Sequence, residues 1–291
     1  MTSDGANREA NPEPNVAGPF TTKFLGIGPR NWIKIVVYGL LFLNFFYYLG
    51  EDIEVARHTM RDDWNVFDWT AVFATTLDEL AWFILLILFE LETYLLDDAA
   101  FTPLRLKLMH GIRFVCFVFI AHTVYAFSGT IWDLQWVAPV SADLCNLVER
   151  DLSFARNLDY LALDAGNCRQ LSATGSYFIF ENGELVTDAA GMRIEKQLAW
   201  VDLLEVLCWL LVVGALELLV RLQERGITAG NALRSTLWVK WTAYGALWLA
   251  AAYWALRGHW IFVWDEALWI LGFMAIGMNL AQWREEIDAD P

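Results

Sequence analysis

The sequence lacks the short motifs that mark most enzymes. It has no phosphate-binding glycine motif, no C-x-x-C pair and no H-E-x-x-H pair, so nucleotide hydrolysis, thiol exchange and zinc proteolysis have no support. No serine stands in a nucleophile-elbow context, and no helix carries regularly spaced arginines that would indicate a voltage sensor. An intramembrane enzyme is therefore the weakest functional hypothesis. The sequence indicates no catalytic residue, and whether the protein binds a metal ion is unknown.

Basic residues are also scarce. The chain has 20 Lys and Arg against 35 Asp and Glu, a net charge of -15, so we expect no nucleic-acid partner. Residues 1–30 lack an apolar core and a small-residue cleavage site, so we predict no cleaved signal peptide. This polar segment is expected to be a disordered cytoplasmic tail.

Long apolar runs are abundant, and hydrophobic residues make up 57% of the chain. Lipid admits only helices or closed barrels, and runs of about 20 residues are too long for barrel strands. We expect an all-α integral membrane protein, with a six-helix transmembrane bundle in segments 31–132 and 198–282 and a cytoplasmic tail in 283–291. A soluble protein with buried helices is the alternative. The predicted helices are 32–49, 69–96, 109–132, 198–220, 237–256 and 260–280.

The distribution of Lys and Arg predicts the orientation. Basic residues gather before the first helix, between the second and third, and between the fourth and fifth. Positive charge in short loops favours the cytoplasmic side. We therefore expect a multi-pass protein of the cell (inner) membrane with both termini in the cytoplasm.

Residues 133–197 form a long segment between the third and fourth helices, which this orientation makes extracytoplasmic. It contains Cys145 and Cys168, for which an oxidising compartment permits a disulfide bond. Ser141 and Ser153 are each expected to begin a short helix, and the bond requires the chain to turn back between them. Asn182-Gly183 between alternating apolar residues predicts a β-hairpin. We expect a small α+β cap that either only covers the bundle or binds a ligand or partner.

The chain also contains an internal repeat of helical hairpins. Trp32-x-Lys34-x-x-x-Tyr38-Gly39 aligns without gaps to Trp238-x-Lys240-x-x-x-Tyr244-Gly245, and each helix is followed by one carrying Asp-Glu-x-x-Trp. The third and fourth predicted helices resemble a diverged third copy, with Arg113 at the lysine position and Glu205 before Trp209. Such repeats occur in transport folds and in purely structural bundles.

Carboxylates recur at equivalent depths of the even-numbered helices. These are Asp78 and Glu79, Asp202 and Glu205, and Asp265 and Glu266, each with a tryptophan about one turn deeper. A carboxylate inside a membrane costs about 2–3 kcal/mol even on lenient scales, so it seeks a proton, a cation or a basic partner. We predict an ion or proton pathway formed by Asp78, Glu79, Glu90, Glu205, Asp265 and Glu266. The alternative is that these groups are structural and lie nearer the interface.

A second charged set lies near the opposite helix ends. Lys34, Arg113 and Lys240 stand about one turn inside the odd-numbered helices, and Glu217 lies at similar depth. We interpret these four as structural ion pairs or snorkelling groups, and Glu90 as either their partner or a continuation of the pathway.

Two functional hypotheses follow. The first is a small cation- or proton-coupled transporter or channel that uses the intramembrane carboxylates. The second is a non-catalytic accessory or scaffold subunit of a larger membrane complex. No organic cofactor is identified, and a bound cation is the candidate ligand. The expected partners are the lipid bilayer and either a second copy of the chain or a membrane-complex subunit.

Overall fold

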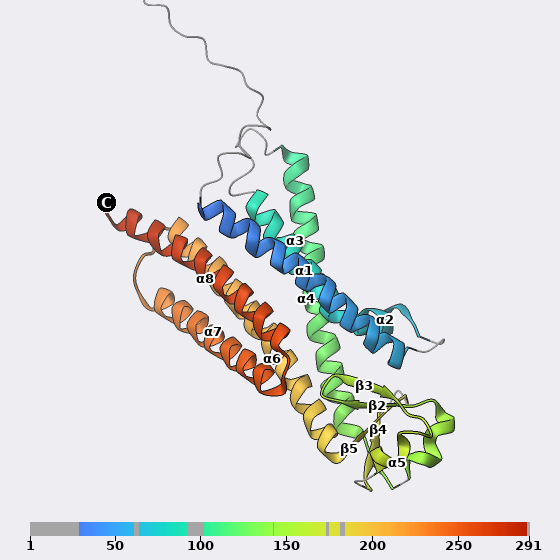
Figure 1. Ribbon diagram of the computed structural model, residues 1–291. Coiled ribbons are helices and arrows are strands. Elements are labelled where there is room, and N and C mark those ends of the chain that lie inside the picture. Colours follow the sequence, from blue (N-terminus) through green and yellow to red (C-terminus); the bar gives the residue numbers. More distant parts are fainter. Residues whose placement is uncertain are drawn as a thin grey trace, which may run out of the picture. The chain divides into compact units, whose positions relative to one another are not determined.

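The computed structural model describes residues 29–60, 64–91, 102–141, 143–172, 175–180 and 184–289. The chain is mostly helical, at 79%, with one small sheet. It divides into two compact units, residues 1–40 and 41–291. The described part of the first unit is the beginning of helix α1, and all other elements in Figure 1 belong to the second unit.

Six long helices and the short helix α2 account for most of the described chain. Their bounds are α1 Pro29–Thr59, α2 Val66–Val72, α3 Ala74–Glu90, α4 Pro103–Trp136, α6 Ala189–Glu224, α7 Asn231–Arg257 and α8 Trp260–Ala289. Helix α6 packs against α4 and α7, α3 packs against α4, and α7 packs against α8. Thr102 caps α4 with Pro103 in its first turn, and Asp188 caps α6 through the Gly191 amide, as these residue types favour.

Two of the described helices, α4 and α6, are long and apolar enough to cross a membrane. Helices α2 and α3 pass the same test only as a pair bent by 74°. These helices indicate membrane association and confirm that part of the prediction. The six-helix bundle and the side of the membrane on which each terminus lies stay predictions.

The second predicted helix, 69–96, is wrong as one continuous element. It is interrupted at Phe73, where α2 ends and α3 begins. Neither proline nor glycine stands at this break, so composition alone does not reveal it. A capping box of Asn65 and Asp68 starts α2. The helix ends at Phe73, and a separate acceptor, the Asp52 carboxylate, bonds the Thr76 backbone N–H in the first turn of α3.

The segment between α4 and α6 folds as a cap around a five-stranded sheet in the order β1-β4-β5-β2-β3. The strands are β1 Pro139–Val140, β2 Ser153–Arg156, β3 Asp159–Ala162, β4 Tyr177–Ile179 and β5 Leu185–Asp188. The β2–β5 pair is parallel and the other pairs are antiparallel. The sheet lies beside the first turns of α6, as Figure 1 shows.

The predicted hairpin in the cap is confirmed, because β4 and β5 pair with Tyr177 opposite Asp188. Its Asn182-Gly183 tip lies outside the described residues. The helix predicted from Ser153 is wrong, since this segment forms the β2–β3 hairpin. Phe154 and Ala155 are buried on successive positions, so both faces of the strand are covered and the usual alternation is lost.

A short 3₁₀ helix, η3 Leu144–Arg150, precedes the sheet. Its cap is Asp143 and not the predicted Ser141, because the Asp143 carboxylate accepts a hydrogen bond from the Cys145 amide at 3.0 Å. The predicted disulfide between Cys145 and Cys168 is confirmed, with 4.9 Å between the two Cα atoms. It joins η3 to the short helix α5, Cys168–Leu171.

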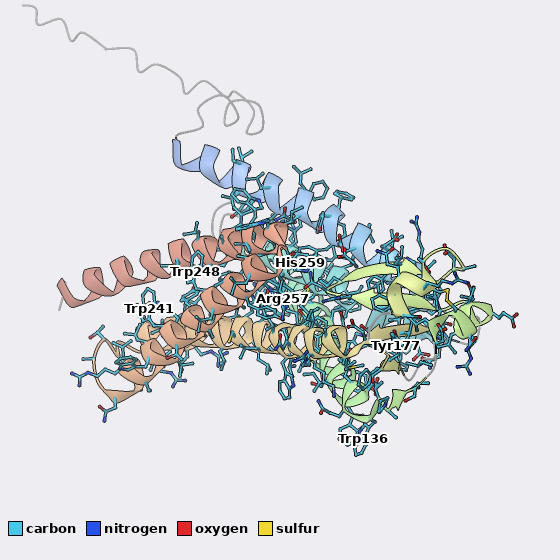
Figure 2. The ribbon with its side chains drawn as sticks, turned by 60° about the horizontal axis from the view of Figure 1, so that its bottom comes forward. Trp136, Tyr177, Trp241, Trp248, Arg257 and His259 are labelled. Carbon is cyan, nitrogen blue, oxygen red and sulfur yellow. A yellow bond between two sulfur atoms is a disulfide. The ribbon has the colours of Figure 1, made fainter. Side chains whose placement is uncertain are left out.

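The cap has a hydrophobic core of its own. Leu144, Leu152, Tyr177 and Val186 are each at most 2% exposed, and they form one cluster with Cys168. Tyr177, labelled in Figure 2, keeps its hydroxyl satisfied by donating to the Leu171 carbonyl oxygen at 3.2 Å. Both cysteines of the disulfide contact this cluster, and cross-links stabilise domains with small cores.

We predict that the double variant Cys145→Ser/Cys168→Ser lowers the free energy of unfolding of the cap by about 3 kcal/mol, as expected for closing a loop of this length, a sequence separation of 23. Hydrogen exchange of the cap amides measures this change. Cys116→Ala, which removes a buried free thiol in α4, is the control. Equal cap protection in the wild type and the double variant would contradict the prediction.

We also predict a pH dependence from Asp143. Hydrogen bonds from the Cys145 amide and then the Ser172 hydroxyl lower the pKa of Asp143 below its usual range. This stabilisation is present above the unfolded pKa of about 3.9 and is lost as the pH falls through the lower folded pKa. Below about pH 4, wild-type η3 should lose protection, whereas the protection of η3 in Asp143→Asn, whose side chain does not titrate, should not change with pH in this range. Hydrogen exchange at Cys145 against pH tests this, with Glu149→Gln on the same helix as the control.

Candidate functional site

One cavity of about 570 Å³ lies between the helices and the cap in residues 41–291. Its wall includes eleven Asp and Glu side chains, and no Lys, Arg or His is among its described lining residues. The acidic lining residues are Glu51, Asp52, Asp68, Asp78, Glu79, Asp133, Glu195, Asp202, Glu205, Asp265 and Glu266. Ionised carboxylates in a concave site of this kind create a negative potential.

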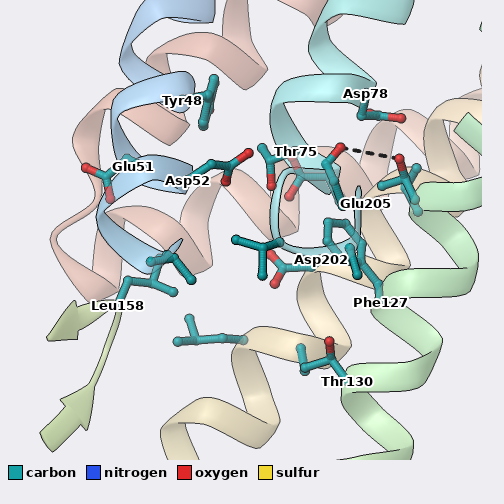
Figure 3. Close-up of a pocket in the computed structure, with 18 of the residues that line it drawn as sticks. Tyr48, Glu51, Asp52, Thr75, Asp78, Phe127, Thr130, Leu158, Asp202 and Glu205 are labelled. Carbon is teal, nitrogen blue, oxygen red and sulfur yellow. Dashed lines mark hydrogen bonds between the residues drawn. The ribbon is translucent and has the colours of Figure 1, made fainter. Parts of the chain in front are cut away.

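The structure brings the predicted carboxylates of three helices to this one cavity. Asp78 and Glu79 come from α3, Asp202 and Glu205 from α6, and Asp265 and Glu266 from α8. Figure 3 shows Asp78, Asp202 and Glu205 around the same space, with Asp52 of α1 facing them. The two α8 carboxylates are the most enclosed, with Asp265 5% and Glu266 2% exposed.

Indole N–H groups hold three of these carboxylates. Trp82 donates to Asp78 at 3.0 Å on the same helix. Trp209 of α6 donates to Glu266 of α8 at 3.2 Å, and Trp254 of α7 donates to Glu205 of α6 at 2.9 Å. Two of the three bonds therefore join different helices, which sequence spacing within one helix does not indicate.

Asp265 is held by two residues that the sequence analysis missed. The Asn44 amide donates to one oxygen at 2.7 Å, and the Tyr48 hydroxyl donates to the other at 3.4 Å. Tyr48 occupies the position equivalent to Trp254 when the gapless alignment of Trp32 with Trp238 is continued along the two helices. Continuing the repeat in this way would have identified Tyr48 and Trp254 as equivalent side chains, but not the acids to which they donate.

The acids also interact with one another. Glu79 lies close to Asp265, and Glu205 lies close to Glu266. A proton or a cation bound between two such carboxyl groups relieves their repulsion. Two buried oxygen atoms, Oδ1 of Asp78 and Oε1 of Glu266, accept no hydrogen bond. The described part of the site therefore provides fewer hydrogen-bond donors and positive charges than its carboxylate oxygens require.

Four aromatic side chains of α3, α6 and α8 lie together in the cavity wall. The rings of Trp209 and Phe273 are 5.3 Å apart, and Trp82 lies 6.2 Å from Phe273 and 6.5 Å from Trp209. Trp269 stacks on Phe273 at 6.1 Å. We call Trp82, Trp209, Trp269 and Phe273 the aromatic floor.

The cap also contributes to the cavity wall, through the β2–β3 turn. Asn157 and Leu158 have φ values of 56° and 65°, the left-handed pair of a tight hairpin turn, which is unfavourable for leucine. The Asn157 amide N–H donates to Glu195 at 2.8 Å, and its side chain donates to the Arg257 carbonyl oxygen at 3.2 Å. The turn is therefore held on α6 and α7, and Leu158 lines the cavity (Figure 3).

A second contact joins the cap to α1. His58 stacks on Tyr160 with ring centres 5.6 Å apart, and its Nδ1 atom hydrogen-bonds the Ser153 hydroxyl at 2.7 Å. Burial, and then the negative charges of Glu195 and Asp202, raise the pKa of Tyr160 above its usual range. Tyr160 therefore presents a neutral hydroxyl-bearing ring at the cap side of the cavity.

Asp52 has a structural role that the sequence analysis did not assign. Its carboxylate accepts the Thr76 backbone N–H at 2.9 Å, in the first turn of α3, whose own N-cap Phe73 provides no side-chain hydrogen bond. A carboxylate at a helix N-terminus satisfies a free amide and complements the helix dipole. Asp52 thus stabilises the start of α3, just before Asp78 and Glu79.

The predicted inner set is only partly described. The side chains of Lys34 and Glu90 lie outside the described part, so the pathway predicted through Glu90 is not tested. Glu217 is paired with Arg221 on its own exposed helix face at 2.8 Å. Lys240 is 7% exposed and lies over the Trp241 ring at 4.9 Å. Arg113 and Lys240 each make a further interaction. None of Arg113, Glu217 or Lys240 lines the cavity.

Within the described ranges, no group of three or more His, Cys, Asp or Glu side chains is arranged to hold a metal ion. Comparison with known protein families, with curated proteins and with solved structures finds no match to this chain. The chemistry of the site therefore follows from its own residues.

We predict that Asp52→Ala destabilises the start of α3 by about 1 kcal/mol, because it leaves the Thr76 amide without its acceptor. Asp52→Asn retains an acceptor oxygen and is expected to lose less. Hydrogen exchange at the Thr76 amide separates the two variants from the wild type. The idea fails if alanine and asparagine have the same small effect.

Proposed function

We propose that the protein is a small cation- or proton-coupled transporter or channel whose ligand enters the carboxylate-lined cavity. The observation that supports this most directly is the convergence of Asp78, Glu79, Glu205, Asp265 and Glu266 from three helices on one cavity. These five groups bind the cation or relay the proton.

Electrostatics favours a positively charged ligand. Carboxylates withdrawn from water require a proton, a cation or a basic partner, and the described lining residues include no basic side chain. Hydrogen bonds from tryptophan, tyrosine and asparagine stabilise the carboxylates in place, but neutral donors do not cancel their charge. Charge balance therefore comes from the ligand or from protons.

The arrangement of the walls supports movement of the ligand. The broken α2–α3 pair contributes Ala71, Val72, Ala74 and Thr75 to the cavity. In membrane transport proteins, interrupted helices commonly form the substrate site. The aromatic floor then acts as the barrier on one side, and the cap with Leu158 covers the other.

The accessory-subunit hypothesis uses different features of the molecule. Large apolar side chains are exposed on α7, among them Trp238, Trp241 and Trp248, and Figure 2 shows Trp241 and Trp248 pointing away from the helix. Lipid covers such a surface as readily as a protein partner does. The cavity is the feature that distinguishes the two hypotheses, because a scaffold has no need of it.

We predict that wild-type protein in proteoliposomes carries cation flux under an imposed proton or sodium gradient, and that Glu79→Gln and Asp265→Asn each reduce the flux at least about ten-fold. Loss of one charge at a cation site costs about 1.4 kcal/mol or more, which is a factor of ten. The amides keep the size of the side chains, so folding is preserved.

Glu149→Gln, an exposed cap variant outside the cavity wall, should retain wild-type flux. All four proteins are first checked for a monodisperse folded state. Wild-type rates in both cavity variants would contradict the assigned pathway. Absence of flux in the wild type would contradict the transport proposal and favour an accessory subunit, for which co-purification in mild detergent is the next test.

A further inference from the structure

We infer that the ligand of the cavity is an organic polyammonium ion, of the linear polyamine class. This inference deepens the proposed function and rests on its central element, a cation held by the cavity carboxylates. Four features of the wall lead to it: a donor-deficient buried carboxylate, an excess of acids, an aromatic floor and the size of the space.

The first feature is Glu266. Its side chain is 2% exposed and lines the cavity. Oε2 accepts the Trp209 indole N–H at 3.2 Å, whereas Oε1 accepts no hydrogen bond. A buried carboxylate oxygen without a donor is costly, and an ammonium N–H satisfies it while cancelling the charge. The unpartnered Oδ1 atom of Asp78 presents the same need on α3.

The second feature is the number of acidic side chains. Eleven acidic side chains and no described basic side chain line the wall. One monovalent ion neutralises only one of them, whereas a polyamine carries several ammonium groups into the cavity in one binding event. Linking the charges makes each later contact intramolecular, which raises the overall affinity.

The third feature is the aromatic floor. Its four rings lie in the same wall as the carboxylates, and Phe262 adds a fifth ring to this wall. Aromatic faces attract organic cations, and they also pack against the methylene segments that join the ammonium groups. A fully hydrated inorganic ion makes no use of these apolar surfaces.

The fourth feature is size. The cavity holds about 570 Å³, which lies within the range of about 300–1,000 Å³ found for small-molecule sites. An inorganic cation is held by oxygen atoms about 2.0–2.6 Å away and occupies a small fraction of such a space. An extended polyamine can reach carboxylates of α3, α6 and α8 together.

The test uses isothermal titration of the full-length protein in detergent with spermidine, at physiological ionic strength. Spermidine should bind at least about ten-fold more tightly than Mg²⁺ or Na⁺. Choline is an organic cation without an N–H donor, and it should bind more weakly than spermidine. Glu266→Gln should weaken spermidine binding at least about ten-fold, since it removes the charge but keeps an acceptor for Trp209.

Glu205→Gln provides a second cavity variant in case Glu266→Gln fails to fold, and it should show a similar loss. Glu149→Gln is the control for adsorption to the acidic surface and should bind spermidine like the wild type. An equal loss in Glu149→Gln, or unchanged binding in the folded cavity variants, would overturn the inference.

Failure of the inference can be told from failure of the proposed function. Flux of an inorganic cation that depends on Glu79 and Asp265, together with absent or weaker binding of spermidine, overturns the polyamine assignment alone. Absence of both flux and spermidine binding overturns both. Tight spermidine binding that needs Glu266, whether or not sodium or proton flux is seen, supports the polyamine assignment.

Discussion

The structure depends on the stabilisation of carboxylates inside an apolar helical assembly. Neutral side chains donate hydrogen bonds to four of the acids: an indole to each of Asp78, Glu205 and Glu266, and a phenol and an amide to Asp265. These donors are neutral. They keep the carboxylates in position without pairing their charge, so the cavity remains available to a cation or proton.

The same bonds link the helices. Glu205 connects α6 to α7, Glu266 connects α8 to α6, and Asp265 connects α8 to α1 within residues 41–291. Asp52 of α1 also connects α1 to α3, because its carboxylate takes the place of the missing side-chain cap at the start of α3. These acids therefore have structural roles in addition to the ligand-binding role that we propose, and substitutions by amide, which keep the acceptor, are the informative ones.

The cap contributes rigidity at one end of the site. Its own core and the Cys145–Cys168 bond let it fold as a compact unit, and Asn157 and His58 hold it on the helices. Of the two roles expected for the cap, simple covering or binding of a ligand or partner, the position of Leu158 and Tyr160 in the cavity wall favours binding under the proposed function.

The sequence by itself determined the helical character, the disulfide, the β4–β5 hairpin and six of the eleven acids of the cavity wall, because hydropathy, cysteine placement, Asn-Gly turns and membrane-depth charge are local signals. Tertiary structure alone decided the break at Phe73, the β2–β3 hairpin and the partners of the acids. Trp209 is four residues from Glu205 in the chain, yet it donates to Glu266, 57 residues away. Such pairings depend on which faces of distant helices meet, and a single sequence carries no local pattern for that.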